Sequence, residues 1–191
     1  MMKTDTRSDI MQAALELLVE QGFHGAPMAQ IAKRAEVAAG TIYCHFENRE
    51  ALIHAVVKEL EMRINGAIVD DLSPEMPTRH RFVAICRELL HYLIVHPLEF
   101  RYLEQFHNSP FGAKHRREQI FGTEAEPPIC RELFERGIAE GVIKDLPVVL
   151  LYGLTFGPLI IVVRDHILGE IVLDERLIEQ VVDACWDAVR R

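Results

Sequence analysis

The chain has 191 residues, a formal net charge of −8 and a hydrophobic content of 49%. This length allows one domain or two small ones with a sizeable core, and the hydrophobic content excludes a disordered chain. The negative charge excludes a protein covered in basic surface. It leaves room for a local DNA contact, which needs only a few well-placed groups.

The cysteines and the apolar segments favour a cytoplasmic protein. Cys44, Cys86, Cys130 and Cys185 form no CxxC pair, and the N-terminal residues do not resemble a signal peptide. We therefore expect reduced thiols. Residues 147–163 are almost entirely apolar, but the segment is short for a membrane span and contains Gly153, Gly157 and Pro158. We expect it to form a helix buried in protein, with no membrane contact.

Four helical patterns are predicted in the N-terminal part. The first begins at a candidate N-cap, Thr6, and ends at Gly22. Pro27 suits the first position of the second helix, and a tight turn then leads to a third helix that ends near Phe46. Asn48 is a good N-cap for a long fourth helix, which we expect to link two domains.

The remainder of the chain also reads as helices. A break at residues 71–78 is followed by a clean amphipathic pattern that His96-Pro97 ends. Residues 112–128 are polar and are predicted to form a loop with a short helical piece. The other predicted helices cover about 98–108, 129–140, 147–168 and 174–189. No strand alternation is visible, so the expected fold is all-α with about nine helices.

One sequence motif extends over more than thirty residues near the N-terminus. Its elements are Gly22-Phe23, Ile31-Ala32, Ala35, Val37, Gly40-Thr41-Ile42-Tyr43, His45-Phe46 and Arg49-Glu50-Ala51-Leu52. In order and spacing it resembles the DNA-binding domain of the TetR family of transcriptional regulators. The resemblance implies a DNA-binding domain over residues 1–50, with a helix-turn-helix at about 27–46, and a ligand-binding and dimerisation domain over 51–191.

The third helix would carry most of the DNA contacts. Gly40 lets the backbone approach a phosphate, and Thr41 offers a hydroxyl in the first helical turn. Tyr43 could instead be a core aromatic, but Phe46 takes the core role and the two cannot share a face. The expected DNA-binding residues are Pro27, Ala39, Gly40, Thr41, Tyr43, Cys44, His45 and Arg49. Among them Ala39, Tyr43 and Cys44 are best placed to read bases.

Three departures from the family pattern weaken the expected DNA affinity. Ala26-Pro27 replaces a common hydroxyl residue, Glu36 replaces a turn glycine, and Ala38-Ala39 replaces a frequent serine-lysine pair. Residues 1–50 contain five basic and seven acidic side chains, a net charge of −2. Because counterion release scales with the number of phosphates neutralised, we expect a shallow dependence of binding on salt.

The helix at 98–108 is apolar or aromatic around most of its circumference. It should lie between layers, where a cavity for a small, largely apolar or aromatic effector could form, although an ordinary core helix gives the same pattern. Glu104 beside aromatic rings could also suit a cationic ligand. The expected ligand-binding residues are Tyr92, Phe100, Tyr102, Leu103, Glu104, Phe106, His107, Tyr152 and Phe156.

The last two helices have apolar stripes that are too wide for one core. Pairing them across a two-fold axis gives a four-helix interface, as in TetR-like proteins, and two glycines spaced by four would allow close approach. The alternative is that Gly157-Pro158 only kinks the helix. The expected interface residues are Gly153, Gly157, Ile161, Ile178, Val182, Cys185 and Val189.

These patterns predict a homodimeric regulator, most simply a repressor that binds a palindromic operator in double-stranded DNA and is released by a small molecule. The alternative is a helical partner-binding or ligand-carrier protein with a degenerate DNA-binding head. An enzyme is disfavoured, since no GxSxG, HExxH or phosphate-loop motif occurs. The histidine spacing does not favour a metal site, and no cofactor or catalytic residue is expected.

Overall fold

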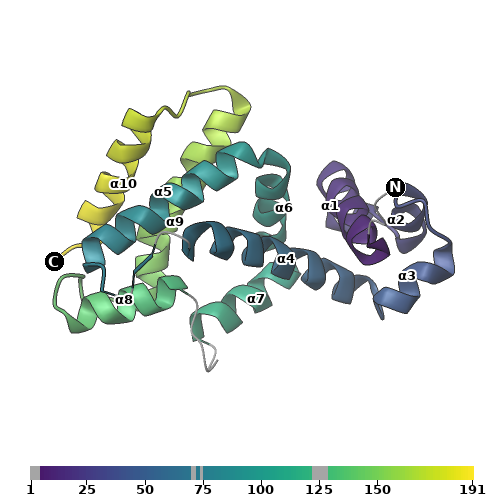
Figure 1. Ribbon diagram of the computed structural model, residues 1–191, viewed down its shortest axis with the longest axis horizontal. Coiled ribbons are helices and arrows are strands. Elements are labelled where there is room, and N and C mark those ends of the chain that lie inside the picture. Colours follow the sequence, from purple (N-terminus) through teal and green to yellow (C-terminus); the bar gives the residue numbers. More distant parts are fainter. Residues whose placement is uncertain (1–4, 70–71, 74, 122–128) are drawn as a thin grey trace. The chain divides into compact units, whose positions relative to one another are not determined.

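The computed structural model describes residues 5–69, 72–73, 75–121 and 129–191. These ranges contain ten α-helices and no strand, apart from an isolated bridge between Ile143 and Arg190 (Figure 1). The helices are α1 (Thr6–Gly25), α2 (Met28–Arg34), α3 (Ala39–His45), α4 (Arg49–Val69), α5 (Thr78–Val95), α6 (Pro97–His107), α7 (Pro110–Phe121), α8 (Ile129–Ala139), α9 (Val148–Leu168) and α10 (Glu175–Val189). The all-α prediction is confirmed.

The tenth helix is α7, where the sequence predicted a loop with a short helical piece. Ser109, which follows the end of α6, accepts a hydrogen bond from the Gly112 N–H and so caps the start of α7. Pro110 follows at the first helical position, which proline favours. The prediction was wrong because α7 is polar and lacks an apolar stripe. Residues 122–128 of that predicted loop lie outside the described ranges.

Several predicted helix ends are confirmed, with small shifts. The Asn48 side chain accepts from the Ala51 N–H at 2.8 Å, and Asp174 accepts from Leu177 at the same distance. Asp5 rather than Thr6 caps α1, since the Asp5 carboxylate accepts from the Arg7 N–H. Pro27 is the N-cap residue of α2 rather than its first helical residue.

The chain divides into two compact units, each of which is built from two separate segments of the sequence. Unit 1 consists of the described residues of Met1–Arg63 together with Leu98–Arg116, and unit 2 consists of the described residues of Ile64–Pro97 and Arg117–Arg191. Thus α6 and the first part of α7 pack with the N-terminal helices, although they lie well beyond residue 50. The functional division at residue 50 stays a prediction.

In unit 1, α6 is held by hydrogen bonds to the backbones of two other helices. The Tyr102 hydroxyl donates to the Ile53 carbonyl of α4 at 3.0 Å, and the Gln105 amide donates to the Val19 carbonyl of α1 at 3.2 Å. The Phe23 ring lies 5.4 Å from the Tyr102 ring, centroid to centroid. Phe23 therefore belongs to the core that fixes α6.

Unit 2 is a helical bundle in which α5, α9 and α10 pack against one another and α8 contacts α5 and α9. Phe82 of α5 and Trp186 of α10 meet edge to face, with centroids 5.2 Å apart. One face of α9 is buried in this bundle, but Leu150, Leu154 and Ile161 are exposed. Within this chain α9 is therefore buried in protein on one face only. By length and composition alone α9 could also cross a membrane.

Arg49 closes the corner between α1 and α2. Gly22 has a φ of 74°, a left-handed conformation that glycine adopts without strain, and it breaks the helical backbone near the end of α1. The chain carbonyls freed there face the start of α4. The half-buried Arg49 guanidinium donates from Nε to the Ala26 carbonyl at 3.0 Å and from Nη2 to the Phe23 carbonyl.

This geometry predicts that Arg49 stabilises the fold of unit 1. Hydrogen bonds from a charged donor contribute about 1.5–3 kcal/mol, so Arg49→Ala should lower the free energy of unfolding by about 2 kcal/mol. Arg49→Lys should lose most of the same energy, because an ammonium cannot reproduce the fork. Urea unfolding followed by circular dichroism measures the change, with the exposed Arg101→Ala on α6 as the control. Equal stability of Arg49→Ala and wild type would contradict this role.

Candidate functional site

The short helix α3 is anchored on one side and exposed on the other. Ile42 is fully buried and Phe46, which directly follows the helix, is almost so. Tyr43 exposes 58% of its surface, which excludes the alternative that it is a core aromatic. Cys44 and His45 are also exposed, while Thr41 is half-buried. The predicted contact residues of α3 thus share the outer surface of the helix.

The first turn of α3 is also open. Ala39 is exposed, and a Cβ atom built on Gly40 would have no neighbour within 4 Å. Internal packing therefore does not require a glycine at position 40, whereas close approach of an external group would. The thiol of Cys44 lies 3.6 Å from the Gly40 carbonyl, within the same helix.

The turn between α2 and α3 contains a backbone conformation that is unusual for its residue. Glu36 has a φ of 56°, in the left-handed region. Its N–H donates to the Lys33 carbonyl, and the Val37 N–H donates to the Ala32 carbonyl at 3.0 Å, which ends α2. A non-glycine residue in this region costs about 1 kcal/mol or more, and tertiary packing must hold it there.

Two predicted DNA-binding residues occupy different roles in the structure. The donors of Arg49 are engaged by the carbonyls of Phe23 and Ala26, so its side chain positions the helix-turn-helix from within. Pro27 is exposed at the start of α2 but provides no side-chain hydrogen bond there. Arg49 was expected to contact DNA because the motif fixes its position in the sequence. The motif does not show in which direction the Arg49 guanidinium points.

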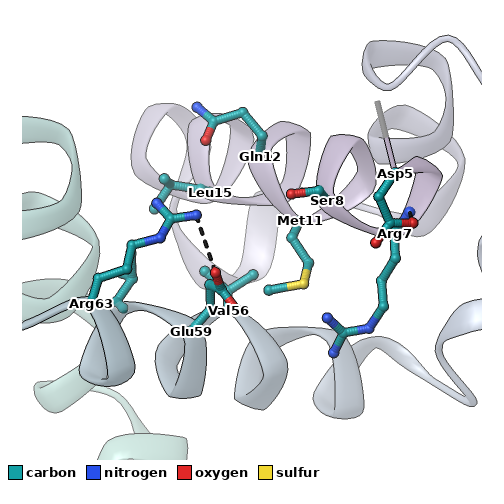
Figure 2. Close-up of a pocket in the computed structure, with 10 residues that line it drawn as sticks. Asp5, Arg7, Ser8, Met11, Gln12, Leu15, Val56, Glu59 and Arg63 are labelled. Atoms are coloured by element: carbon teal, nitrogen blue, oxygen red, sulfur yellow. Dashed lines mark hydrogen bonds and ion pairs between the residues drawn. The ribbon is translucent and has the colours of Figure 1, made fainter. Parts of the chain in front are cut away.

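A narrow groove of about 190 Å³ lies between α1 and α4 in unit 1 (Figure 2). Its charged groups are already partnered: Arg63 contacts Glu59 at 3.3 Å and Glu99 at 3.1 Å, and the Arg7 guanidinium lies 5.3 Å from the centre of the Phe46 ring. Because these charges are matched internally, we assign the groove no ligand.

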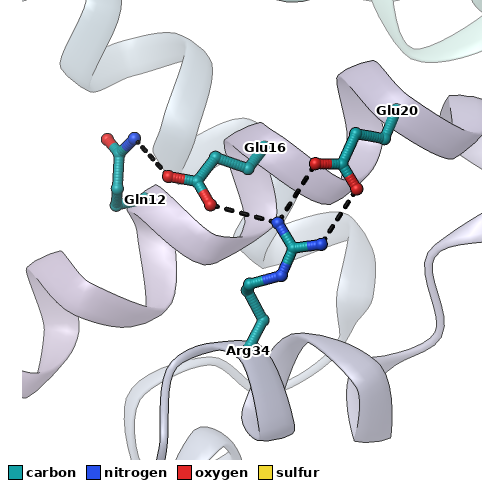
Figure 3. A network of polar contacts seen from close by, with 4 residues as sticks. All are labelled: Gln12, Glu16, Glu20 and Arg34. Atoms are coloured by element: carbon teal, nitrogen blue, oxygen red, sulfur yellow. Dashed lines mark hydrogen bonds and ion pairs between the residues drawn. The ribbon is translucent and has the colours of Figure 1, made fainter.

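A second polar network fixes α2 onto α1 and reduces the charge available for DNA. Figure 3 shows the Arg34 guanidinium between two carboxylates of α1, at 3.2 Å from Glu16 and 2.9 Å from Glu20. The hydrogen bond from Arg34 holds the pKa of Glu20 below its usual value. Sequence analysis counted Arg34 only as a positive charge, although the spacing of Glu16 and Glu20 by four residues signals a shared helical face.

The predicted ligand residues of α6 lie mainly in the core of unit 1. Phe100, Tyr102 and Phe106 are buried, and Leu103 nearly so. Burial raises the pKa of Tyr102, whose hydroxyl is engaged by the Ile53 carbonyl. Glu104 is half-buried and His107 is exposed. Phe100, Tyr102, Leu103 and Phe106 thus occupy the positions of an ordinary core helix, the alternative left open by the sequence.

The remaining predicted ligand residues lie in unit 2. Tyr152 and Phe156 of α9 meet the buried Phe134 of α8, with ring centroids 5.4 Å and 6.4 Å from it. Between them on α9 lies Thr155, which is buried and whose hydroxyl has no described hydrogen-bond partner. Burial raises the pKa of Tyr152. Tyr92 stacks on His96 at 4.4 Å on α5, apart from this group in the chain.

Sequence analysis missed Phe134 and Thr155. A buried polar group normally has a hydrogen-bond partner, so the unpaired Thr155 hydroxyl marks this place as unusual. The signal in the sequence was a threonine inside an otherwise apolar segment, between two aromatic residues spaced by four.

The predicted interface residues separate into two groups. Ile178, Val182, Cys185 and Val189 of α10 are buried within the chain, so these side chains do not form an exposed surface and that expectation is corrected. The reason is that α10 directs its apolar stripe onto α5 and α9. On α9, Gly153 and Gly157 have open space at their Cβ positions, and Ile161 is 52% exposed.

Comparison with known proteins covers both parts of the chain. Residues 10–56 match the family model described as bacterial regulatory proteins, tetR family, and residues 77–190 match the one described as Tetracyclin repressor-like, C-terminal domain. An uncharacterized HTH-type transcriptional regulator from Haemophilus influenzae is 22% identical over 195 residues, which cover 99% of this chain and 98% of that protein.

Solved structures show the same fold. A transcriptional regulator of the TetR family from Vibrio parahaemolyticus has a TM-score of 0.77 at 30% identity, covering 98% of this chain and 99% of its own. FadR from Bacillus subtilis, in complex with stearoyl-CoA, has a TM-score of 0.70 at 20% identity, covering 94% and 95%. The chain belongs to the TetR family of helix-turn-helix transcriptional regulators.

Proposed function

We propose that this regulator is a cytoplasmic homodimeric repressor that binds a palindromic DNA operator and is released by a small, largely apolar effector. The observation that carries the proposal is the orientation of α3. Ile42 and Phe46 face the core, and Tyr43, Cys44 and His45 are left exposed together. A helix with one buried side and one exposed polar ridge suits insertion into a major groove.

In this proposal some side chains of α3 contact the DNA phosphates and others contact the bases. Thr41, Tyr43 and His45 contact phosphates and set the position of α3, while Ala39 and Cys44 face base edges. Arg49 acts from inside unit 1 by fixing the corner that supports α2 and α3. In a two-fold dimer, the two recognition helices would enter successive major grooves about 34 Å apart.

The DNA proposal predicts a loss of affinity without a loss of stability. Removing one hydrogen bond to a charged phosphate costs about 1.5 kcal/mol, so Tyr43→Ala and His45→Ala should each weaken operator binding about tenfold. Fluorescence anisotropy on DNA from the protein's own upstream region measures this. Thermal unfolding should be unchanged, because both side chains are exposed.

The control for this experiment is His80→Ala, an exposed histidine of α5 in unit 2. Because Arg34 is paired with Glu16 and Glu20, few basic side chains of residues 1–50 remain free to contact phosphates. Operator binding should therefore depend only weakly on salt concentration. Wild-type affinity in both α3 variants would favour a partner-binding protein with a degenerate head.

The dimer proposal rests on the exposed face of α9. Leu150, Leu154 and Ile161 follow helical spacing along it, and Gly153 and Gly157 leave room for another backbone between them. A contiguous apolar surface of this kind marks a protein contact. A second copy of α9 that crosses here would bury the same face on both subunits.

This interface predicts that a charge on α9 dissociates the dimer. Ile161→Glu would bury a carboxylate without a partner, which costs several kcal/mol. Light scattering after size-exclusion chromatography should then give the mass of one chain, while each monomer stays folded because position 161 is exposed. Gln180→Glu, at an exposed position of α10, is the matched control. A dimer of unchanged mass in Ile161→Glu would remove α9 from the interface.

We place the effector site at Phe134, Tyr152, Thr155 and Phe156 in unit 2. Three aromatic rings provide an apolar wall, and the unpaired Thr155 hydroxyl provides one polar contact. This composition is typical of small-molecule sites, where a few polar groups orient an apolar ligand. The fold shared with FadR in complex with stearoyl-CoA supports an apolar effector.

Thr155→Val tests this assignment in two ways. Without ligand it should raise the free energy of unfolding by about 1 kcal/mol, because it removes a buried hydroxyl that lacks a partner while keeping the shape. With stearoyl-CoA as the probe, Thr155→Val should reduce the ligand-induced rise in melting temperature, and Thr155→Ser should retain it. A destabilised Thr155→Val variant with full ligand response would contradict the assignment.

A further inference from the structure

Three histidines from three helices surround one phenylalanine in unit 1. The rings of His54 of α4, His107 of α6 and His115 of α7 lie 5.9, 5.5 and 5.5 Å from the Phe106 ring, centroid to centroid. The His54 and His115 rings are 6.4 Å apart. We call these three side chains the histidine cluster. It joins the long helix that follows the helix-turn-helix to the α6–α7 corner.

One carboxylate lies in close contact with this cluster. The half-buried Glu61 carboxylate of α4 lies 2.6 Å from Nε2 of His115, and the His115 side chain is buried. The next carboxylate, Glu50, is 3.7 Å from His54 but is itself well exposed, so solvent screens it. Glu61 can therefore neutralise one imidazolium at close range, and a second or third would have only the screened Glu50 nearby.

Other charged side chains flank the three histidines along their helices. On α4 Lys58 is exposed between His54 and Glu61, on α6 Glu104 lies one turn before His107, and on α7 Lys114, Arg116, Arg117 and Glu118 lie next to His115 in the sequence. Glu61 and Arg116 act on His107 in opposite directions. Once Glu61 is paired with one imidazolium, each further proton bound by the cluster adds a positive charge without a close counter-charge.

The α6–α7 corner beside the histidine cluster is tightly packed, so α7 cannot move closer to α6. A Cβ atom at Gly112 of α7 would lie 2.1 Å from the Phe106 carbonyl oxygen and 2.6 Å from the His107 Cα. The backbones of α6 and α7 are thus in close contact at Phe106 and His107, where α6 ends. Repulsion between the rings cannot be relieved by a small shift of α7 towards α6, and it would instead separate α7 from α4.

We propose that the histidine cluster is an acid-sensitive release for DNA: when two or more of its imidazoles are protonated, α7 separates from α4 and the helix-turn-helix loses its support. The inference rests on the proposed DNA-binding function. The connection runs through α4, which carries His54 and Glu61 and begins at Arg49, the residue that closes the α1–α2 corner.

The direction of the pH effect on stability follows from the difference in proton binding between the folded and the unfolded chain. Burial lowers the pKa of His107, and the nearby His115 and Arg116 lower it further, while Glu61 opposes them. The unfolded chain therefore binds a proton at this position more readily than the folded chain. Stability from a neutral His107 is present above a pH of about 6.5 and is lost as the pH falls through that value.

The experiment uses the full chain and two readouts. Operator affinity is measured by anisotropy between a pH of about 7.5 and about 5.5, the range in which histidine titrates, and should fall about tenfold in the wild type. Hydrogen exchange of residues 110–118 is measured without DNA over the same range, corrected for the intrinsic effect of pH, and should show a comparable loss of protection.

Three variants identify the source of the change. His54→Gln combined with His107→Gln removes two of the three imidazoles, and should keep both protection and affinity at low pH. Glu61→Gln keeps the shape but removes the counter-charge, and should move the loss to higher pH. His80→Gln, an exposed histidine in unit 2, should behave as wild type. His107 is partly exposed, so His107→Gln alone serves if the double variant does not fold.

The outcomes separate this inference from the proposed function. Unchanged protection of α7 in the wild type, or equal loss in the double variant, would overturn the inference. Loss of protection without loss of affinity would also overturn it, because the cluster would not control DNA binding. Absence of operator binding at every pH would refute the proposed function instead, while the exchange data would still report on the cluster.

Discussion

The burial of Ile42 and Phe46 is the constraint on which the DNA-binding surface depends. The helix α3, which these two residues anchor, has seven residues, too few to be stable in water by itself. Its conformation and its rotation are therefore set by the core beneath it. Because side chains at neighbouring positions point in different directions, seating these two residues leaves Tyr43, Cys44 and His45 exposed.

Three arginines of the N-terminal helices form contacts within the fold, which leaves fewer basic groups free to contact DNA. Arg34 ties α2 to the acidic face of α1, Arg49 closes the corner after Gly22, and Arg7 covers the Phe46 ring. Each contact keeps α3 in place, but each also withdraws donors from a phosphate. An acidic protein can bind DNA in this way only if shape and a few neutral or weakly basic groups supply the specificity.

Local features of the fold could be predicted from the sequence, and long-range ones could not. The caps at Asn48 and Asp174 need only residues a turn away, and the α3 motif is a contiguous pattern, so both were accessible. The hydrogen-bond partners of Arg49 lie 23 and 26 positions earlier in the chain. No local sequence pattern shows that the Arg49 guanidinium points towards them. The helix α7 was missed because its stability comes from contacts such as that of His115 with Glu61.

The aromatic residues show why a composition argument could not separate a core from a ligand site. Tyr102 and Thr155 are both buried polar groups in helices that carry aromatic residues spaced by four. The difference is one hydrogen bond: the Tyr102 hydroxyl donates to the Ile53 carbonyl, whereas the Thr155 hydroxyl has no described partner. A buried hydroxyl with a hydrogen-bond partner stabilises the fold, whereas one without a partner destabilises it, and a bound molecule could supply the missing partner. The aromatic residues of α6 are therefore explained by packing, and the unpaired hydroxyl on α9 is what supports the proposed ligand site there.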